Sequence, residues 1–151
     1  MIIRNITKKD SLDIWHWRND KISIFFSKNK KKITLKNHDK WFEKNLTNTR
    51  IKSYIGYIVE KNVKRKVGIV RFNIKGKHAL VSINLNPVMR GKRMSYILLA
   101  KAIKKFLKFK KLNLIAEIKK NNLASINCFF KSRFYFIKSK NNYNFYKRSS
   151  S

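Results

Sequence analysis

The fold of this chain is decided by residues 82–95, which read SINLNPVMRGKRMS. A predicted strand, Ala79–Leu85, ends at Asn86-Pro87, because proline cannot donate a hydrogen bond to a strand ladder. An amphipathic helix follows directly, with apolar residues at helical spacing over Met94–Leu107. The first turn of a helix has unpaired N–H groups at the positive end of its dipole, so the junction predicts either a phosphate site or a loop of solvated charges. Its basic residues are Arg90, Lys92 and Arg93.

The rest of the sequence predicts an α/β fold with a mixed, mainly antiparallel sheet. Apolar alternation favours strands over residues 2–6, 54–60, 67–74, 112–118, 134–138 and 143–147. Helical spacing favours helices up to about residue 19 and over 34–46, 94–107 and 122–131. We expect turns at Asn62–Lys66 and Lys75-Gly76-Lys77, and a capping box formed by Thr7 and Asp10. The strand–helix–strand unit around residue 90 should be a parallel crossover, and a length of 151 residues predicts one domain, 1–151.

The net charge of +31 has two explanations. Such a charge attracts polyanions, and it predicts at least non-specific binding of nucleic acid. A genome of low GC content also explains it, because Lys, Asn and Ile are all abundant and the lysines are spread along the chain. The hydrophobic content of 43% excludes a disordered tail protein. No apolar run is long enough to span a membrane and no signal peptide is visible, so we expect a soluble cytoplasmic protein. The spacing of the three His residues predicts no metal site.

Residues 90–95 resemble the acetyl-CoA loop of the GNAT superfamily of acyl-CoA N-acyltransferases, whose pattern is Arg/Gln-x-x-Gly-x-Gly/Ala. Arg90 fills the first position, whereas Arg93 and Ser95 replace the two small residues. The element order is similar to that of the family over nearly the whole chain. The resemblance implies a GNAT fold with acetyl-CoA as co-substrate. It places the CoA pyrophosphate on backbone amides of residues 91–95, which are Gly91, Lys92, Arg93, Met94 and Ser95, and pantetheine beside Leu85.

A second match lies in residues 115–126, which read IAEIKKNNLASI and resemble the next strand and helix of the family. It implies that Asn122 contacts the pantetheine arm, and that Ser125 and Phe129 line the same part of the donor site. Many members have a Tyr at the position of Phe129 that protonates the leaving thiolate. Because Phe129 cannot donate a proton, CoA is expected to leave as a thiolate that water protonates. Cys128 beside it is interpreted as a core thiol.

Three segments of the N-terminal half are similar to one GNAT branch, the nucleotide-sugar N-acetyltransferases of pseudaminic and other nonulosonic acid pathways. They are residues 15–20 (WHWRND), 38–42 (HDKWF) and 68–72 (GIVRF). The resemblance implies that the acceptor is a UDP-linked amino sugar. The residues it brings to the acceptor site are Trp17, Arg18, Asn19, His38, Trp41 and Arg71. From the residues alone, Arg18 could clamp a diphosphate or be a charge at the end of a helix. The tryptophans are more often core residues than a substrate platform, and His38 could belong to the core or contact the substrate.

Glu117 is the candidate general base, because transfer to an amine requires a neutral nucleophile and the chain has only seven carboxylates. Desolvation on an apolar strand would raise its pKa toward neutrality. The alternative is an edge-facing Glu paired with a lysine, since a shift of one residue in register reverses its face. Two other functions stay open: acetylation of ribosomal or other proteins, and nucleic-acid binding on a decayed acyltransferase fold. A homodimer is compatible with either enzyme.

Overall fold

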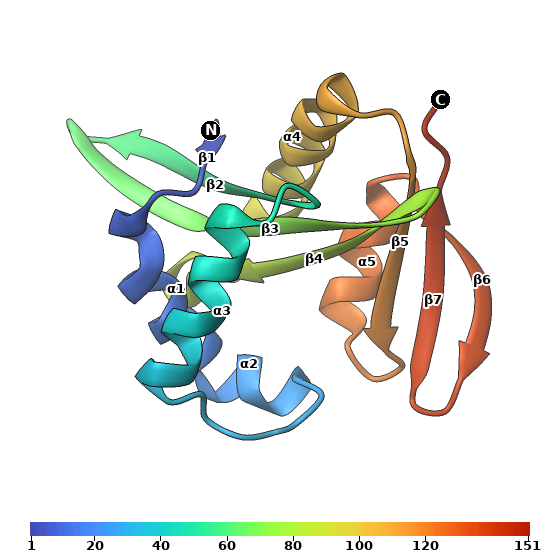
Figure 1. Cartoon of the computed structure of the whole chain (residues 1–151), viewed down its shortest axis with the longest axis horizontal. Helices are drawn as coiled ribbons and strands as arrows, with labels where there is room; N and C mark the ends of the chain where they lie inside the picture. The colour runs from blue at the N-terminus through green and yellow to red at the C-terminus, as the bar shows by residue number, and fades with distance from the viewer.

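The computed structural model describes all 151 residues and contains a seven-stranded sheet in the order β1-β2-β3-β4-β5-β7-β6 (Figure 1). The strands are β1 (Ile2–Asn5), β2 (Ile51–Glu60), β3 (Val63–Lys75), β4 (His78–Leu85), β5 (Asn113–Lys119), β6 (Tyr135–Lys140) and β7 (Tyr143–Arg148). The helices are α1 (Ser11–Arg18), α2 (Lys21–Phe26), α3 (Leu35–Thr47), α4 (Met94–Phe109) and α5 (Leu123–Lys131). Only the pair β4–β5 is parallel. The predicted α/β class and mainly antiparallel sheet are therefore confirmed.

The sheet separates two hydrophobic cores. Helices α4 and α5 pack on one face through apolar side chains that include Leu98, Phe106 and Phe129, and the ring of Phe106 stacks on that of Phe72 from β3. Helices α1 and α3 pack on the other face, where Trp17 and other apolar side chains meet strands β2 and β3. Alternate residues of the central strands thus point to different helical layers, which Figure 1 shows on the two sides of the sheet.

A buried carboxylate anchors the entry to the first helical layer. Thr7 and Asp10 form the predicted capping box, and the side chain of Asp10 is fully buried. Arg4 donates two hydrogen bonds to Asp10, at 2.7 and 2.8 Å, and the Lys66 ammonium lies 2.8 Å from its other face. A charge buried in this way is tolerated because each carboxylate oxygen has a cationic partner.

One local prediction was wrong, and one helix was missed. The first hairpin turn is Lys61-Asn62 rather than Asn62–Lys66, because both residues take left-handed φ angles (49° and 63°), as a two-residue hairpin turn requires. Helix α2 was not predicted, because its sequence, KISIFF, has no helical alternation of polar and apolar residues. Asp20 begins this helix by accepting hydrogen bonds from the backbone N–H groups of Ile22 and Ser23.

Strands β4 and β5 pair over only three residues, His78–Leu80 with Asn113–Ile115. Beyond Leu80 they diverge, as Figure 1 shows, so the remainder of β4 has no partner on the side that faces β5. This unpaired edge leads directly into the loop before α4. None of the helices is long and apolar enough to cross a membrane.

Candidate active site

The loop before α4 presents free backbone donors. None of the backbone N–H groups from Gly91 to Ser95 donates a hydrogen bond to another residue of the chain. Gly91 and Arg93 both adopt left-handed φ angles, 74° and 57°. Arg93 therefore adopts a left-handed conformation that glycine takes more readily, at the cost of strain. The arrangement of free N–H groups at a helix start can hold a phosphate group.

Relief of that strain gives a stability prediction. Changing Arg93→Gly should raise the free energy of unfolding by about 0.5–1 kcal/mol, because left-handed backbone costs an L-residue about 1–2 kcal/mol and the greater freedom of the unfolded glycine offsets part of the gain. Urea denaturation measures the change. Lys92→Gly is the matched control, since Lys92 has no positive φ and its replacement should destabilise. A lower stability for Arg93→Gly would contradict the strain argument.

Arg90 binds helix α2 rather than standing free at the loop. Its guanidinium lies 2.6 Å from Asp20 and donates a second hydrogen bond to the hydroxyl of Ser23 at 3.1 Å. Ser23 in turn donates to Asn84 on β4 at 3.1 Å. A pyrophosphate on the loop would therefore share this guanidinium with Asp20. Lys92 and Arg93 are exposed and have no carboxylate partner, so they are available to such a group.

The residues at α5 that were predicted to line the donor site make contacts within the protein itself. The side chain of Asn122 caps α5 by accepting from the N–H of Ser125 at 3.2 Å. Phe129 is buried and packs edge-on against Phe134, at 4.9 Å between ring centroids. The thiol of Cys128 is buried as well, which raises its pKa. These positions favour structural roles, and Leu85 is the predicted donor-site residue that packs half-buried beside the unpaired edge of β4.

Glu117 lies on the face of β5 opposite α4 and α5. Its neighbours Ala116 and Ile118 are buried in the core of α4 and α5, so the pleat turns Glu117 to the other side. The carboxylate is 28% exposed and forms an ion pair with Lys28, at 3.1 Å. The environment is thus a partly solvated ion pair and not the desolvated apolar surface that the prediction assumed.

On the same face of the sheet, two guanidinium groups gather at Trp41 of α3. The Arg18 guanidinium lies over the indole ring, 3.9 Å from its centroid, and that of Arg71 from β3 lies 5.8 Å from it. Neither pairs with a carboxylate; Arg71 donates to Asn45 at 2.7 Å. Burial, together with the charge of Arg71, lowers the pKa of Arg18 to about 10, so Arg18 is a cation at neutral pH. Burial also lowers the pKa of Arg71, whose guanidinium stays protonated at neutral pH as guanidinium groups in proteins do. Two unneutralised guanidiniums over one indole suit a planar anionic group.

His38 stands behind Arg18. The histidine is fully buried, its Nε2 lies 2.9 Å from the carbonyl oxygen of Ser11, and its Nδ1 lies 3.3 Å from Arg18 Nη1. Because a carbonyl only accepts, Nε2 carries the proton and Nδ1 accepts from Arg18. Burial lowers the pKa of His38 and favours this neutral form. His38 therefore positions Arg18 and is itself covered by protein, and its predicted substrate contact stays a prediction.

Two further residues predicted at the acceptor site support the scaffold. Trp17 is buried in the core beneath α1 and α3. Both ends of the Asn19 amide are bonded to the backbone of Ile33, at 2.7 and 2.9 Å, which fixes the loop before α3. Sequence reasoning missed Lys28 and Asn45. No local signal links Lys28 to Glu117 or Asn45 to Arg71, because these pairs are 89 and 26 residues apart in the chain.

Comparisons with known proteins agree on the architecture. A family profile described as acetyltransferase (GNAT) domain matches residues 1–134, and no curated protein matches the sequence. A domain from Methanocaldococcus jannaschii is similar, with 23% identity, a TM-score of 0.86, and coverage of 97% of this chain and 96% of that one. A spermidine N-acetyltransferase from Vibrio cholerae, in complex with CoA and spermine, is similar with 12% identity, a TM-score of 0.79 and coverages of 97% and 92%. A ribosomal-protein-alanine N-acetyltransferase from Brucella melitensis has 20% identity, a TM-score of 0.80 and 99% coverage of both chains.

Proposed function

The chain belongs to the acetyltransferase (GNAT) domain family, and on that premise we propose that it acetylates the amine of a nucleotide-linked (UDP) amino sugar. Membership makes it an acetyl-CoA-dependent N-acetyltransferase. The observation that carries the proposed acceptor is the pair Arg18 and Arg71 at Trp41, two cations that no carboxylate neutralises. We propose further that residues 1–151 act as a single domain.

The donor side fits acetyl-CoA. The free N–H groups of residues 91–95 would hold the pyrophosphate, and the exposed charges of Lys92 and Arg93 add to this anion site. The unpaired edge of β4 offers backbone groups to the amides of pantetheine, beside Leu85. Bound acetyl-CoA supplies the thioester carbonyl that the amine attacks.

The chemistry rests on Glu117 as general base. An amine acceptor arrives as an ammonium ion, and the carboxylate of Glu117 would take its proton, directly or through a water. In the structure the Lys28 ammonium forms an ion pair with the Glu117 carboxylate, so the acceptor amine would have to displace Lys28. Phe129 offers no proton, so the CoA thiolate would be protonated by solvent. Transfer would be direct, because the one thiol of the chain, that of Cys128, is buried.

The acceptor side favours an anion. A diphosphate can accept paired hydrogen bonds from guanidinium groups, and a uracil base can stack against an exposed part of an indole. His38 holds Arg18 for this contact. A polyamine, which is the substrate of the similar Vibrio cholerae enzyme, would instead meet two unneutralised cations. The same repulsion disfavours the basic tails of ribosomal proteins.

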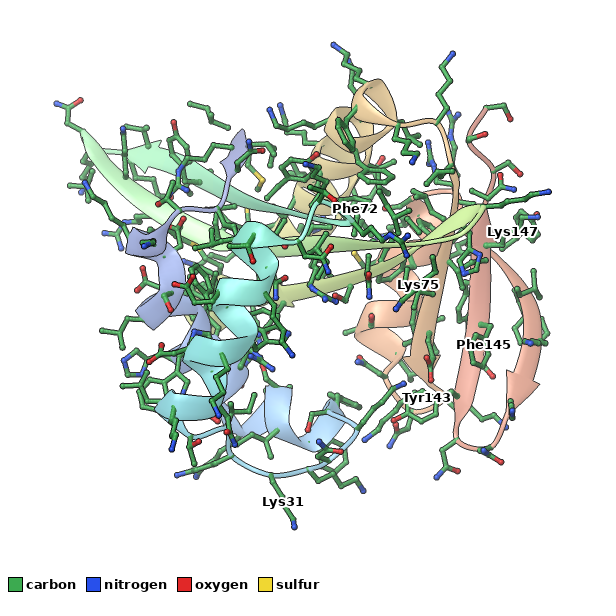
Figure 2. All side chains as sticks on the ribbon, in the orientation of Figure 1. Lys31, Phe72, Lys75, Tyr143, Phe145 and Lys147 are labelled. Carbon is green, nitrogen blue, oxygen red and sulfur yellow. The ribbon has the colours of Figure 1, made fainter.

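The alternative of a nucleic-acid-binding module has less support. Figure 2 shows nitrogen-tipped side chains extending from all sides of the fold, with Lys31 and Lys147 far apart. A nucleic-acid interface would gather basic and aromatic side chains on one face. The charge is therefore better explained by composition than by one binding surface.

Arginine variants test the acceptor. Arg18→Gln and Arg71→Gln should each raise the KM for a UDP-linked amino sugar about 10- to 100-fold, because a charged hydrogen bond is worth about 1.5–3 kcal/mol. Release of CoA thiol measures the rate with UDP-amino sugar, the free amino sugar and spermidine as acceptors. The KM for acetyl-CoA should not change, and Arg50→Gln, at an exposed residue, is the matched control. Equal or better turnover of spermidine would overturn the proposal.

A further inference from the structure

The segment after α2 is fastened to strand β5. Lys119, at the end of β5, donates hydrogen bonds to the carbonyl oxygens of Ser27 (2.7 Å) and Phe25 (3.2 Å). These bonds place the next residue, Lys28, beside Glu117, with its Nζ 3.1 Å from Oε1 and 3.2 Å from Oε2. Tyr143 from β7, labelled in Figure 2, also lies beside Lys28, whose Nζ is 5.6 Å from the centre of the Tyr143 ring.

The other end of α2 is fastened to the donor side. Asp20 and Ser23 hold Arg90 of the loop before α4, and Ser23 also holds Asn84 of β4. Helix α2 and the segment after it therefore reach from the edge of β4 to the edge of β5, where those strands diverge. The Lys28 amine lies at the β5 end of this bridge, beside Glu117.

Lys28 differs from the other lysines in its partner. Among the 29 lysines, only Lys28 and Lys66 form ion pairs with carboxylates. Lys66 is bound to the buried Asp10, at the entry to α1, whereas Lys28 is bound to the candidate base and its side chain is 68% exposed. The Lys28 ammonium thus lies beside Glu117, where the ammonium group of an acceptor is proposed to bind.

We propose that Lys28 is a site of self-acetylation, an inference that rests on the proposed role of Glu117 and of acetyl-CoA. Glu117 accepts a proton from the Lys28 ammonium, and the neutral Nζ attacks the thioester carbonyl carbon. A bond forms between Nζ and that carbon while the carbon–sulfur bond breaks. The attacking nitrogen gives its second proton to water, and CoA leaves as a thiolate that solvent protonates. The proton on Glu117 passes to water, so the products are acetyl-Lys28 and CoA. No oxidant or further reactant is required.

The modification has two consequences. Acetyl-Lys28 is neutral, so its ion pair with Glu117 is lost and the carboxylate is free for an external amine. An acceptor bound beside Glu117 competes with Lys28, so a good acceptor should suppress the modification. Self-acetylation is thus expected when donor is present and acceptor is absent.

Mass spectrometry of peptides tests the proposal. The full-length protein is incubated with acetyl-CoA at moderate salt, and the acetylation rate of Lys28 is compared with those of Lys30 and Lys32, which are exposed neighbours in the same molecule. Lys28 should react about 100-fold faster than either, and Glu117→Gln should reduce it to their rate, because a positioned base contributes a factor of this order. Glu60→Gln is the matched control, since Glu60 pairs only with Arg65, at 3.2 Å.

Acetic anhydride gives a second readout that does not involve CoA. The ion pair protects the Lys28 amine from this reagent, so Lys28 should react more slowly than Lys30 with acetic anhydride and faster with acetyl-CoA. The same ranking with both reagents, or a Lys28 rate that Glu117→Gln does not change, would overturn the proposal. Turnover of a UDP-amino sugar by a protein whose Lys28 is not labelled when acetyl-CoA is supplied without acceptor would refute self-acetylation alone. Labelling of Lys28 without turnover of any such sugar would support it and refute the proposed acceptor.

Discussion

We expect Glu117→Gln to lower kcat for acetyl transfer by about 10²- to 10³-fold and to leave the KM for acetyl-CoA nearly unchanged. The amide has the shape of the carboxylate but cannot take a proton from the acceptor ammonium. The proposed donor site, at the loop before α4 and the edge of β4, does not involve this side chain. The measurement is steady-state release of CoA thiol with the acceptor amine at saturation.

The fold should tolerate this change. The Lys28–Glu117 pair is largely solvated, and such pairs contribute about 0–1 kcal/mol, so Tm should move little. Glu43→Gln, at an exposed residue of α3 that has no ion pair, controls for loss of a negative charge. A Glu117→Gln variant that keeps wild-type kcat would exclude Glu117 as the base and leave deprotonation to solvent.

The largest effect on stability is expected from Asp10→Asn. The change leaves Arg4 and Lys66 without the carboxylate that both contact, at a site that is fully buried. Breaking a buried ion pair from one side costs about 3–5 kcal/mol, a large part of the 5–15 kcal/mol that stabilises a typical domain. Urea denaturation at pH 7 measures the loss.

Acid titration of stability checks the same carboxylate. Hydrogen bonds from Arg4 and Lys66 outweigh desolvation and hold the pKa of Asp10 far below its usual range. An unfolded Asp titrates near pH 3.9, so the stabilisation from Asp10 is complete above that pH and is lost as the pH falls below it. The free energy of unfolding of the wild type should therefore decline in acid more steeply than that of Asp10→Asn. Asp39→Asn, at an exposed residue, should keep the wild-type slope; equal slopes for the wild type and Asp10→Asn would refute the assignment.

The sequence was most informative where local pattern and tertiary role coincide. The strand–loop–helix junction at residues 82–95 was predictable, because β4 and α4 each have a clear period and Pro87 separates them. The capping box of Thr7 and Asp10 follows from spacing alone. Arg18, Trp41 and Arg71, named from short motifs, do lie together in the structure.

The remainder depends on contacts between distant segments. The register of β5 against β7 and the burial of Ala116 decide which way Glu117 points, and neither can be read from one strand. The role of His38 depends on the carbonyl of Ser11, 27 residues earlier. Lys28 occurs in a run of charged residues that has no period, so its pairing with Glu117 is visible only after the chain has folded.

The divergence of β4 from β5 has a consequence for assembly as well as for catalysis. An unpaired strand edge is a template on which any extended chain can add, which is a common origin of aggregation. Here the template lies between two strands of the same sheet, and α2 is bonded to Asn84 of β4 and to Arg90 of the following loop. A pantetheine chain, which carries two amides, would act as a short surrogate strand. Bound acetyl-CoA would then cover the unpaired edge of β4, so that a second polypeptide could not pair with it.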